Sequence, residues 1–182
     1  MEKLILILST LSLYSFSQEE LDLKVLKLVN QYRIENHLKP LIWDSIMTKV
    51  SNHQVNYMST TGHLSHLQLE EDSTNFNVIK KFEDKFINQG VNFKCTVFEN
   101  CSVVFDSDKL STDSIVYHVV NGWKNSVKHN EVLLDKRLVK VGISHKSGTI
   151  YNEELIDENG DLFTITINCI MEWFSLNGYG FK

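Results

Sequence analysis

His129 is the residue whose place in the sequence is best suited to chemistry. It follows Trp123 and Ser126 at steps of three, at the end of a segment whose apolar residues recur at helical spacing: Ile115, Val116, Val119, Val120 and Trp123. A histidine at the end of an apolar face lies half inside the core. That environment can hold the imidazole neutral and oriented, as a metal ligand or a general base requires. The alternative is a partly buried histidine with a structural role only.

Glu99 is a second candidate because of the side chains around it. Alternation from Lys94 to Phe105 predicts a strand, and the row that contains Glu99 also holds Val97, Cys101, Val103 and Phe105. A carboxylate in such an apolar row is costly to bury alone, so we expect Glu99 to have a hydrogen-bonding or cationic partner. The alternative is an exposed position at the edge of a sheet.

His63 and His66 form a third candidate group, directly after the expected end of a helix at Thr60 or Thr61. Both could also be ordinary loop residues. The sequence supplies no recognisable activated nucleophile for them. It has no Gly-x-Ser-x-Gly elbow, no His-Glu-x-x-His pair and no cysteine with a histidine at a telling spacing.

These residues must be positioned by the helices and strands that the hydrophobic patterns predict. We expect helices over residues 19–36, from Asp44 or Ser45 to Thr60 or Thr61, within residues 69–93 and from Ser111 or Thr112 onward. In the helix within residues 69–93 the inward-facing side chains would be Val78, Ile79, Phe82, Phe86 and Ile87. We expect strands over residues 94–105, 138–145, 151–156 and 162–174, the last two joined by the hairpin signal Asn159-Gly160. Helices before and between antiparallel strands predict an α+β fold.

The N-terminal residues are typical of a signal peptide. Residues 1–17 contain Lys3, an apolar run too short to span a bilayer, and small residues at Ser15 and Ser17 where a signal peptidase reads. We expect cleavage before Gln18 and therefore a secreted or periplasmic protein with no membrane span in the mature chain. The alternatives are a buried N-terminal helix and a retained anchor.

Composition is that of one globular domain, which we place at residues 18–182 and expect to be a monomer. Of the 182 residues, 42% are hydrophobic and 23% charged. The net charge of -5 argues against nucleic acid or an anionic membrane as the main partner. The three cysteines cannot all pair internally. Cys95 and Cys101 would lie about 20 Å apart on one strand, so either one can pair with Cys169 or all three are free thiols.

Several short motifs together resemble the CAP superfamily, whose SCP domain occurs in cysteine-rich secretory proteins, antigen 5 and plant pathogenesis-related proteins. In chain order they are Asn30-Gln31-Tyr32-Arg33, Leu41-Ile42-Trp43-Asp44, Met58, Ser65-His66, Glu99-Asn100, and Trp123-x-x-Ser126-x-x-His129 followed by Leu133-Leu134. Their order and spacing are those of the short bacterial branch. The chain departs from the family at Phe98, where a glycine usually precedes the Glu-Asn pair. The resemblance implies a three-layer α-β-α sandwich with a central antiparallel sheet.

The resemblance also implies a ligand-binding cleft formed by His66, Glu99 and His129, with Ser126 where the eukaryotic branch has an acidic residue. Two imidazoles and a carboxylate can hold a divalent metal, and the pattern suits zinc, with His66 and His129 as the metal ligands. Three functions stay open. The chain is an exported protein that binds a metal or small ligand without turnover, a metal-assisted and peptidase-like hydrolase with His66 or His129 as base, or an extracellular interaction module whose cleft has no function.

Overall fold

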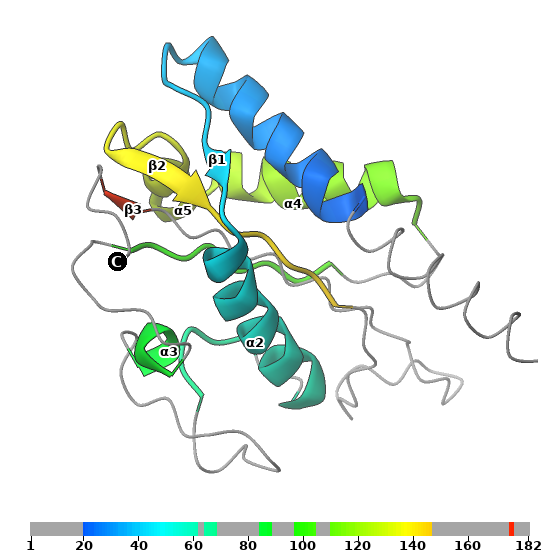
Figure 1. Ribbon diagram of the computed structural model, residues 1–182. Coiled ribbons are helices and arrows are strands. Elements are labelled where there is room, and N and C mark those ends of the chain that lie inside the picture. The colour runs from blue at the N-terminus through cyan, green and yellow to red at the C-terminus, as the bar shows by residue number, and fades with distance from the viewer. Residues whose placement is uncertain are drawn as a thin grey trace, which may run out of the picture.

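The computed structural model describes residues 20–61, 64–68, 84–88, 97–104 and 110–146, and the backbone of a strand at residues 175–176 (Figure 1). The predicted signal peptide, the predicted hairpin at Asn159-Gly160, and Cys95 and Cys169 lie outside these residues. Within the described part, helices and short strands are mixed, as the hydrophobic patterns predict.

The first two helices begin and end close to where the sequence predicts. Residues 20–35 are helical, and Leu21, Val25 and Val29 form the buried stripe of that helix. Helix α2 (Ser45–Thr61) starts at Asp44, whose Oδ1 accepts hydrogen bonds from the backbone N–H groups of Ile46 (3.0 Å) and Met47 (3.1 Å). A side-chain oxygen at this position satisfies amide groups that have no partner inside the helix, which is why Asp44 starts α2.

The sheet of the described residues is mixed and does not confirm the antiparallel sheet that we expected. Strand β1 (Ile42–Trp43) pairs in parallel with β2 (Leu138–Val141), with Ile42 opposite Lys140 and Trp43 opposite Val141. Strand β3 (Ser175–Leu176) pairs with β2 in the antiparallel sense, which gives the order β1-β2-β3. A parallel pair requires a long crossover connection. The helices between β1 and β2 supply it, so the two strands run in the same direction.

Strand β2 is shorter than the predicted strand over residues 138–145. Residues 142–146 belong to no strand, yet residues 142–145 are all buried because they run along α2 and the first helix. Ser51 Oγ of α2 donates to the carbonyl of Gly142 (2.9 Å), and His145 Nδ1 lies 2.7 Å from Asp22 Oδ1 of the first helix. These contacts, made by side chains far apart in the sequence, take the place of ladder hydrogen bonds.

Helix α4 (Thr112–Asn125) begins as predicted, with the Ser111 hydroxyl accepting from the backbone N–H of Ser114 (3.2 Å). His129 is predicted at the end of this helix, but the structure has a second helix there, α5 (Val127–Leu133). Ser126 joins the two, with its N–H donating to the Trp123 carbonyl (3.3 Å) and its carbonyl accepting from Asn130 (2.8 Å). His129 therefore lies within α5 rather than after the end of a helix.

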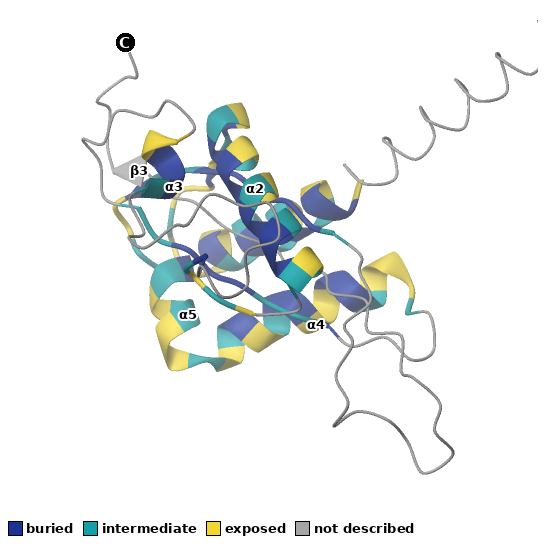
Figure 2. Ribbon diagram, turned by 90° about the horizontal axis from the view of Figure 1, so that it is seen from below, coloured by how far each residue is buried: buried dark blue, intermediate teal, exposed yellow. Residues whose placement is uncertain are grey.

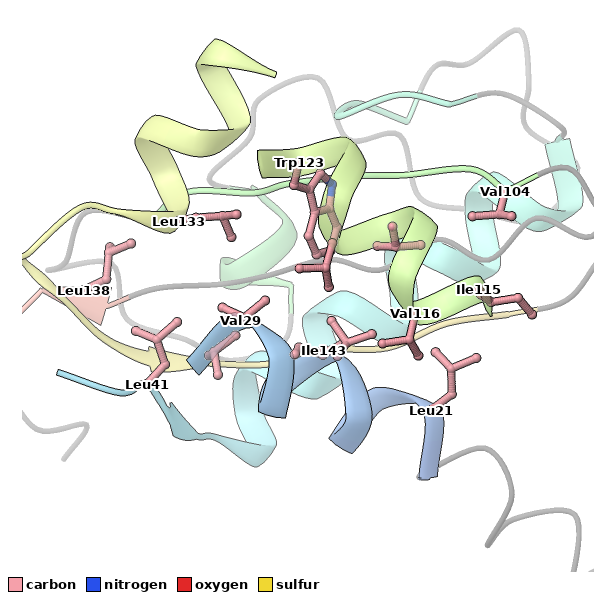
Figure 3. Packing of buried hydrophobic residues seen from close by; sticks show 14 residues of the cluster. Leu21, Val29, Leu41, Val104, Ile115, Val116, Trp123, Leu133, Leu138 and Ile143 are labelled. Carbon is pink, nitrogen blue, oxygen red and sulfur yellow. The ribbon is translucent and has the colours of Figure 1, made fainter. Parts of the chain in front are cut away.

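Buried side chains form two hydrophobic cores. The first core consists of Leu21, Val25, Val29, Leu41, Val104, Ile115, Val116, Val119, Val120, Trp123, Leu133, Leu138, Val141 and Ile143. Figure 3 shows Leu21 and Val29 of the first helix facing Val116 and Trp123 of α4. Trp123 is 1% exposed, which confirms it as a core residue. The second core consists of Met47, Val50, Val55, Tyr57, Met58, Phe86 and Cys101. Figure 2 shows that α2 and α4 each bury one face and expose the other.

Residues 97–104 run between the two cores. The predicted strand is wrong for these residues, which lie in no strand of the described sheet. The predicted alternation of side chains nevertheless holds. Val97, Cys101 and Val103 pack with the second core, whereas Phe98 and Val104 pack with the first. Because each face meets a core of its own, burial rather than hydrogen bonding to a neighbouring strand sets the alternation.

Helix α3 (Asp84–Ile87) is the described part of the helix predicted within residues 69–93. Phe86 is fully buried as expected, but Ile87 is 56% exposed, which corrects its assignment to the inward face. In this turn Lys85 and Phe86 are the buried pair, and Ile87, about 200° around the helix from Lys85, points to solvent. Val78, Ile79 and Phe82 lie outside the described residues. None of the described helices is long and apolar enough to cross a membrane.

Candidate functional site

The site is centred on Glu99, whose carboxylate is buried and has the partners that its position predicts. His66 Nδ1 lies 2.5 Å from Glu99 Oε1, although the two residues are 33 positions apart. The side chain of Glu99 is 1% exposed and that of His66 is 53% exposed. The carboxylate is thus fixed inside the protein, while the imidazole reaches from it to the solvent.

Lys85 on α3 is the cationic partner of Glu99. Its Nζ lies 3.1 Å from Glu99 Oε1 and 3.0 Å from Oε2, and its side chain is 1% exposed. Burial lowers the pKa of Lys85, and the negative charge of Glu99 acts in the opposite direction. Lys85 was not among the site residues predicted from the sequence. The signal was available, because Lys85 lies three positions after Phe82 and therefore on the predicted inward face of that helix.

Cys101 is the second site residue that the sequence-based predictions missed, because it was considered as a disulfide partner or a free thiol and not as a ligand. Cys101 is 6% exposed and forms no disulfide. Its Sγ donates to Glu99 Oε1 (3.4 Å) and lies 3.7 Å from His66 Nδ1. The three atoms that could bind a metal, one each from His66, Glu99 and Cys101, all lie within 4.8 Å of one another. Alternation at i and i+2 places Cys101 on the same face as Glu99 and is the signal that could have revealed it.

His129 lies near this group but outside it. Burial, followed by the positive charge of His66, lowers the pKa of His129, so the two imidazoles are within electrostatic reach of each other. Its backbone carbonyl accepts a hydrogen bond from Asn100 Nδ2 (3.2 Å). The convergence of the two histidines on one ion stays a prediction.

Ser126, the fourth predicted cleft residue, serves the junction of α4 and α5. Its backbone makes the two hydrogen bonds described above, and its side chain does not cap α5. Among the described residues no hydrogen bond connects the Ser126 side chain to His66, Glu99 or His129. A role for Ser126 in the cleft therefore also stays a prediction.

The motif residues of the first helix hold α5, and with it His129, in place. Arg33 is 1% exposed and donates to three backbone carbonyls: Lys39 (3.0 Å), Leu133 (2.5 Å) and Asp135 (3.2 and 3.3 Å). Carbonyl groups at the end of a helix have no partner inside it, and a buried guanidinium with five N–H donors can satisfy several at once. Arg33 thereby fixes the C-terminal end of α5.

A polar network on α2 supports the loop that carries His66. Gln54 Nε2 donates to the carbonyl of Ser65 (2.7 Å), and Gln68 Nε2 donates to Gln54 Oε1 (3.1 Å) and lies 3.1 Å from His53 Nδ1. The residues directly before and two positions after His66 are thus tied to a rigid helix. The exposed imidazole of His66 is therefore presented from a fixed backbone.

The arrangement fits shared coordination better than proton relay. Glu99 Oε1 and Cys101 Sγ both approach the same nitrogen of His66, Nδ1. In a catalytic triad the nucleophile and the carboxylate contact opposite nitrogens of the imidazole, so that one can pass its proton while the other orients the ring. Three donor atoms that lie this close together could instead hold one metal ion.

Comparison with known proteins gives the family and the fold. The sequence profile of the CAP, or cysteine-rich secretory protein, family matches residues 26–154. No functionally curated protein matches the chain. Among solved structures, the chain is similar to an extracellular SCP-domain protein from Bacillus anthracis, with 17% identity, a TM-score of 0.59, and coverage of 88% of this chain and 41% of that one.

Two further structures show the same fold. A cysteine-rich secretory protein from Staphylococcus aureus is 16% identical with a TM-score of 0.53, over 88% of this chain and 40% of that one. An outer surface protein from Borrelia burgdorferi is 18% identical with a TM-score of 0.55, over 86% of this chain and 93% of that one. The chain therefore spans less than half of the first two relatives and nearly all of the third.

Proposed function

Because the chain belongs to the CAP family of cysteine-rich secretory proteins, we propose that it is an exported protein whose cleft of His66, Glu99 and His129 binds a divalent metal ion or a small ligand without turnover. The observation that carries the proposal is the contact between His66 Nδ1 and Glu99 Oε1 across 33 positions of sequence. The carboxylate is buried and the imidazole is half exposed, so this pair of possible ligand groups can be reached from solvent, as a binding site requires.

Export is supported by two observations. Residues 1–17 have the composition of a signal peptide. Two of the proteins with the same fold are described as an extracellular protein and as an outer surface protein. We propose secretion or export to the periplasm, with the CAP domain over residues 18–182 folded as a three-layer α-β-α sandwich.

Zinc is the metal that we propose, because imidazole nitrogen and carboxylate oxygen are both ligands that zinc accepts. Bound zinc would supply a Lewis acid to a ligand in the cleft. The chain's own residues do the positioning: Lys85 orients the Glu99 carboxylate, and the network of Gln54 and Gln68 fixes the backbone beside His66. Of the alternatives, a hydrolase is disfavoured by the approach of Glu99 and Cys101 to one and the same nitrogen of His66.

Titration calorimetry with zinc near neutral pH tests the proposal. Wild type should bind, and His66→Ala and His129→Ala should each weaken binding by about 10-fold or more because each removes a ligand. The matched control is His118→Ala, which removes an exposed histidine on α4. Zinc affinity should also fall as the pH drops below about 6.5, where protons compete for the imidazoles.

Each other result has a defined meaning. If the wild-type protein takes up no zinc, the metal site is contradicted and the binding of a small ligand remains as the proposed function. That ligand would then be sought by soaking and screening. A partner protein whose binding survives replacement of both histidines would support the interaction module instead. Hydrolysis that a chelator abolishes and zinc restores would support the hydrolase.

A further inference from the structure

The buried thiol of Cys101 points to a metal site of different composition from the two-histidine cleft. We propose that Cys101 Sγ, His66 Nδ1 and Glu99 Oε1 are the three protein ligands of a thiophilic metal ion, with Lys85 as a positioning residue for Glu99. The inference rests on the part of the proposed function that places a metal ion in this cleft, and it puts Cys101 in the place of His129 as the third ligand. It goes further by naming a sulfur ligand and, through it, the class of metal.

Two of the three ligand separations already have the values that tetrahedral zinc requires. With a Zn–S bond of about 2.3 Å and Zn–N or Zn–O bonds of about 2.1 Å, sulfur lies about 3.6 Å from each of the other ligand atoms. Cys101 Sγ lies 3.7 Å from His66 Nδ1 and 3.4 Å from Glu99 Oε1. The buried half of the site is therefore preformed.

The third separation must widen when an ion enters. His66 Nδ1 and Glu99 Oε1 are 2.5 Å apart, whereas tetrahedral ligands of this kind lie about 3.4 Å apart. The side chain that must move is that of His66, which is 53% exposed, while the side chain of Glu99 is 1% exposed. If the exposed imidazole turns so that its Nδ1 moves by about 0.9 Å, the separation from Glu99 Oε1 reaches the required value. The buried Glu99 side chain does not have to move.

Charge gives an independent reason for a sulfur ligand. Among the described residues, Glu99 is the anionic ligand of the two-histidine cleft, and Lys85 lies 3.0–3.1 Å from both of its oxygens. The pair has no net charge, so it attracts a dication weakly. Cys101 supplies a second anion when its thiol binds metal, because the S–H proton passes to solvent as the sulfur–metal bond forms. The ion, thiolate, carboxylate and ammonium then sum to a single positive charge, whereas without the thiolate the ion, carboxylate and ammonium sum to two.

The position of Lys85 also allows Glu99 Oε1 to bind a metal ion. Its Nζ contacts both oxygens of Glu99, so it can keep Oε2 while Oε1 turns to the ion. Residues that hydrogen-bond a ligating carboxylate in this way fix its orientation. A thiolate with one imidazole and one carboxylate favours zinc, cadmium and cobalt over magnesium, calcium and manganese, which prefer oxygen ligands.

Cobalt titration of the full exported protein, kept reduced, tests the inference. Cobalt bound to a thiolate shows a sulfur-to-cobalt charge-transfer band in the near ultraviolet, in addition to the visible bands of the ion. Wild type should show this band, Cys101→Ser should lose it, and Cys169→Ser, which changes a different cysteine, should keep it. His66→Ala should weaken cobalt binding by about 10-fold or more. Zinc should displace the cobalt, and millimolar magnesium or calcium should not.

Two results would overturn the inference while leaving the proposed function intact. One is visible cobalt absorption in wild type without the charge-transfer band, since the ion would then have no sulfur ligand. The other is unchanged affinity and spectrum in Cys101→Ser combined with loss of binding in His129→Ala, which would return the site to two histidines. Wild type that binds no cobalt would overturn this inference and the metal part of the proposed function, and would leave the binding of a small ligand. If Cys101→Ser fails to fold, the test is His66→Ala, which replaces a half-exposed side chain and should not disturb folding. Unchanged cobalt affinity in that variant would contradict the proposed site.

Discussion

Gly142 lies where residues after β2 meet the start of α2, and replacing it by alanine should destabilise the protein strongly. A Cβ at this position would lie 2.1 Å from both Met47 C and Thr48 N and 2.6 Å from Met47 Cβ. Ordinary contacts of this kind are at least 3.4 Å, so α2 would have to retreat by 3.4 minus 2.1, or about 1.3 Å. The atoms in the way belong to the backbone of a helix, and no change of rotamer relieves the clash.

The magnitude follows from what holds α2 against Gly142. Overpacking of a filled site costs about 1–3 kcal/mol. Retreat of α2 also stretches the hydrogen bonds from Ser51 Oγ to Gly142 O (2.9 Å) and from Asp44 N to Val141 O (2.8 Å), each of which contributes about 1 kcal/mol. We therefore expect Gly142→Ala to lower the free energy of unfolding by about 3–5 kcal/mol, measured by guanidinium denaturation.

Gly122 provides a control with the opposite sign. It lies on α4, is exposed, and a Cβ built on it meets nothing within 4 Å. Gly122→Ala should stabilise the protein by about 0.5–1 kcal/mol, because alanine loses less backbone freedom on entering a helix. If Gly142→Ala stays within about 1 kcal/mol of wild type while Gly122→Ala behaves as expected, the described packing of β2 against α2 is refuted.

Three further predictions concern the core, the site and the N-terminus. Trp123→Ala should lower the free energy of unfolding by about 3–5 kcal/mol in a denaturant titration, and a loss below about 1 kcal/mol would contradict its burial. In an NMR titration the pKa of His129 should lie below 6.5, and His66→Ala should raise it only in part, because burial remains. The stability linked to this lowered pKa is present above pH 6.5 and is lost as the pH falls through the pKa of the folded state. Sequencing of exported protein should give Gln18 as the first residue, and a start at Met1 would exclude cleavage.

Features encoded by neighbouring residues could be read from the sequence. Asp44 and Ser111 start α2 and α4 because capping needs only a side-chain oxygen within three positions of the amide that it accepts from. The burial of Trp123 follows from helical spacing in the same way. The need of Glu99 for a partner could be stated from its apolar row, since desolvation of a carboxylate is costly whatever the fold.

Features that join distant segments could not be read in this way. The identity of Glu99's partner depends on how α3 docks, and nothing local to Lys85 says that its ammonium will meet that carboxylate. The parallel pairing of Trp43 with Val141 joins strands separated by most of the chain. Helix α5 was missed because its seven residues are too few for a periodic pattern to separate a helix from a turn.

Residues 97–104 pack against a core on each side, and this packing constrains the length of the segment more tightly than it constrains the residue types within it. Its successive side chains are shared between two separate cores, with Glu99 and Cys101 on the face of one and Phe98 and Val104 on the face of the other. In an extended segment, inserting or deleting one residue exchanges the two faces of everything beyond it. A single-residue insertion after Phe98 would turn Glu99 away from Lys85 and drive an unpaired carboxylate toward the first core, whereas a substitution at the same place changes one contact. Homologues should therefore vary in residue type along this segment while keeping its length.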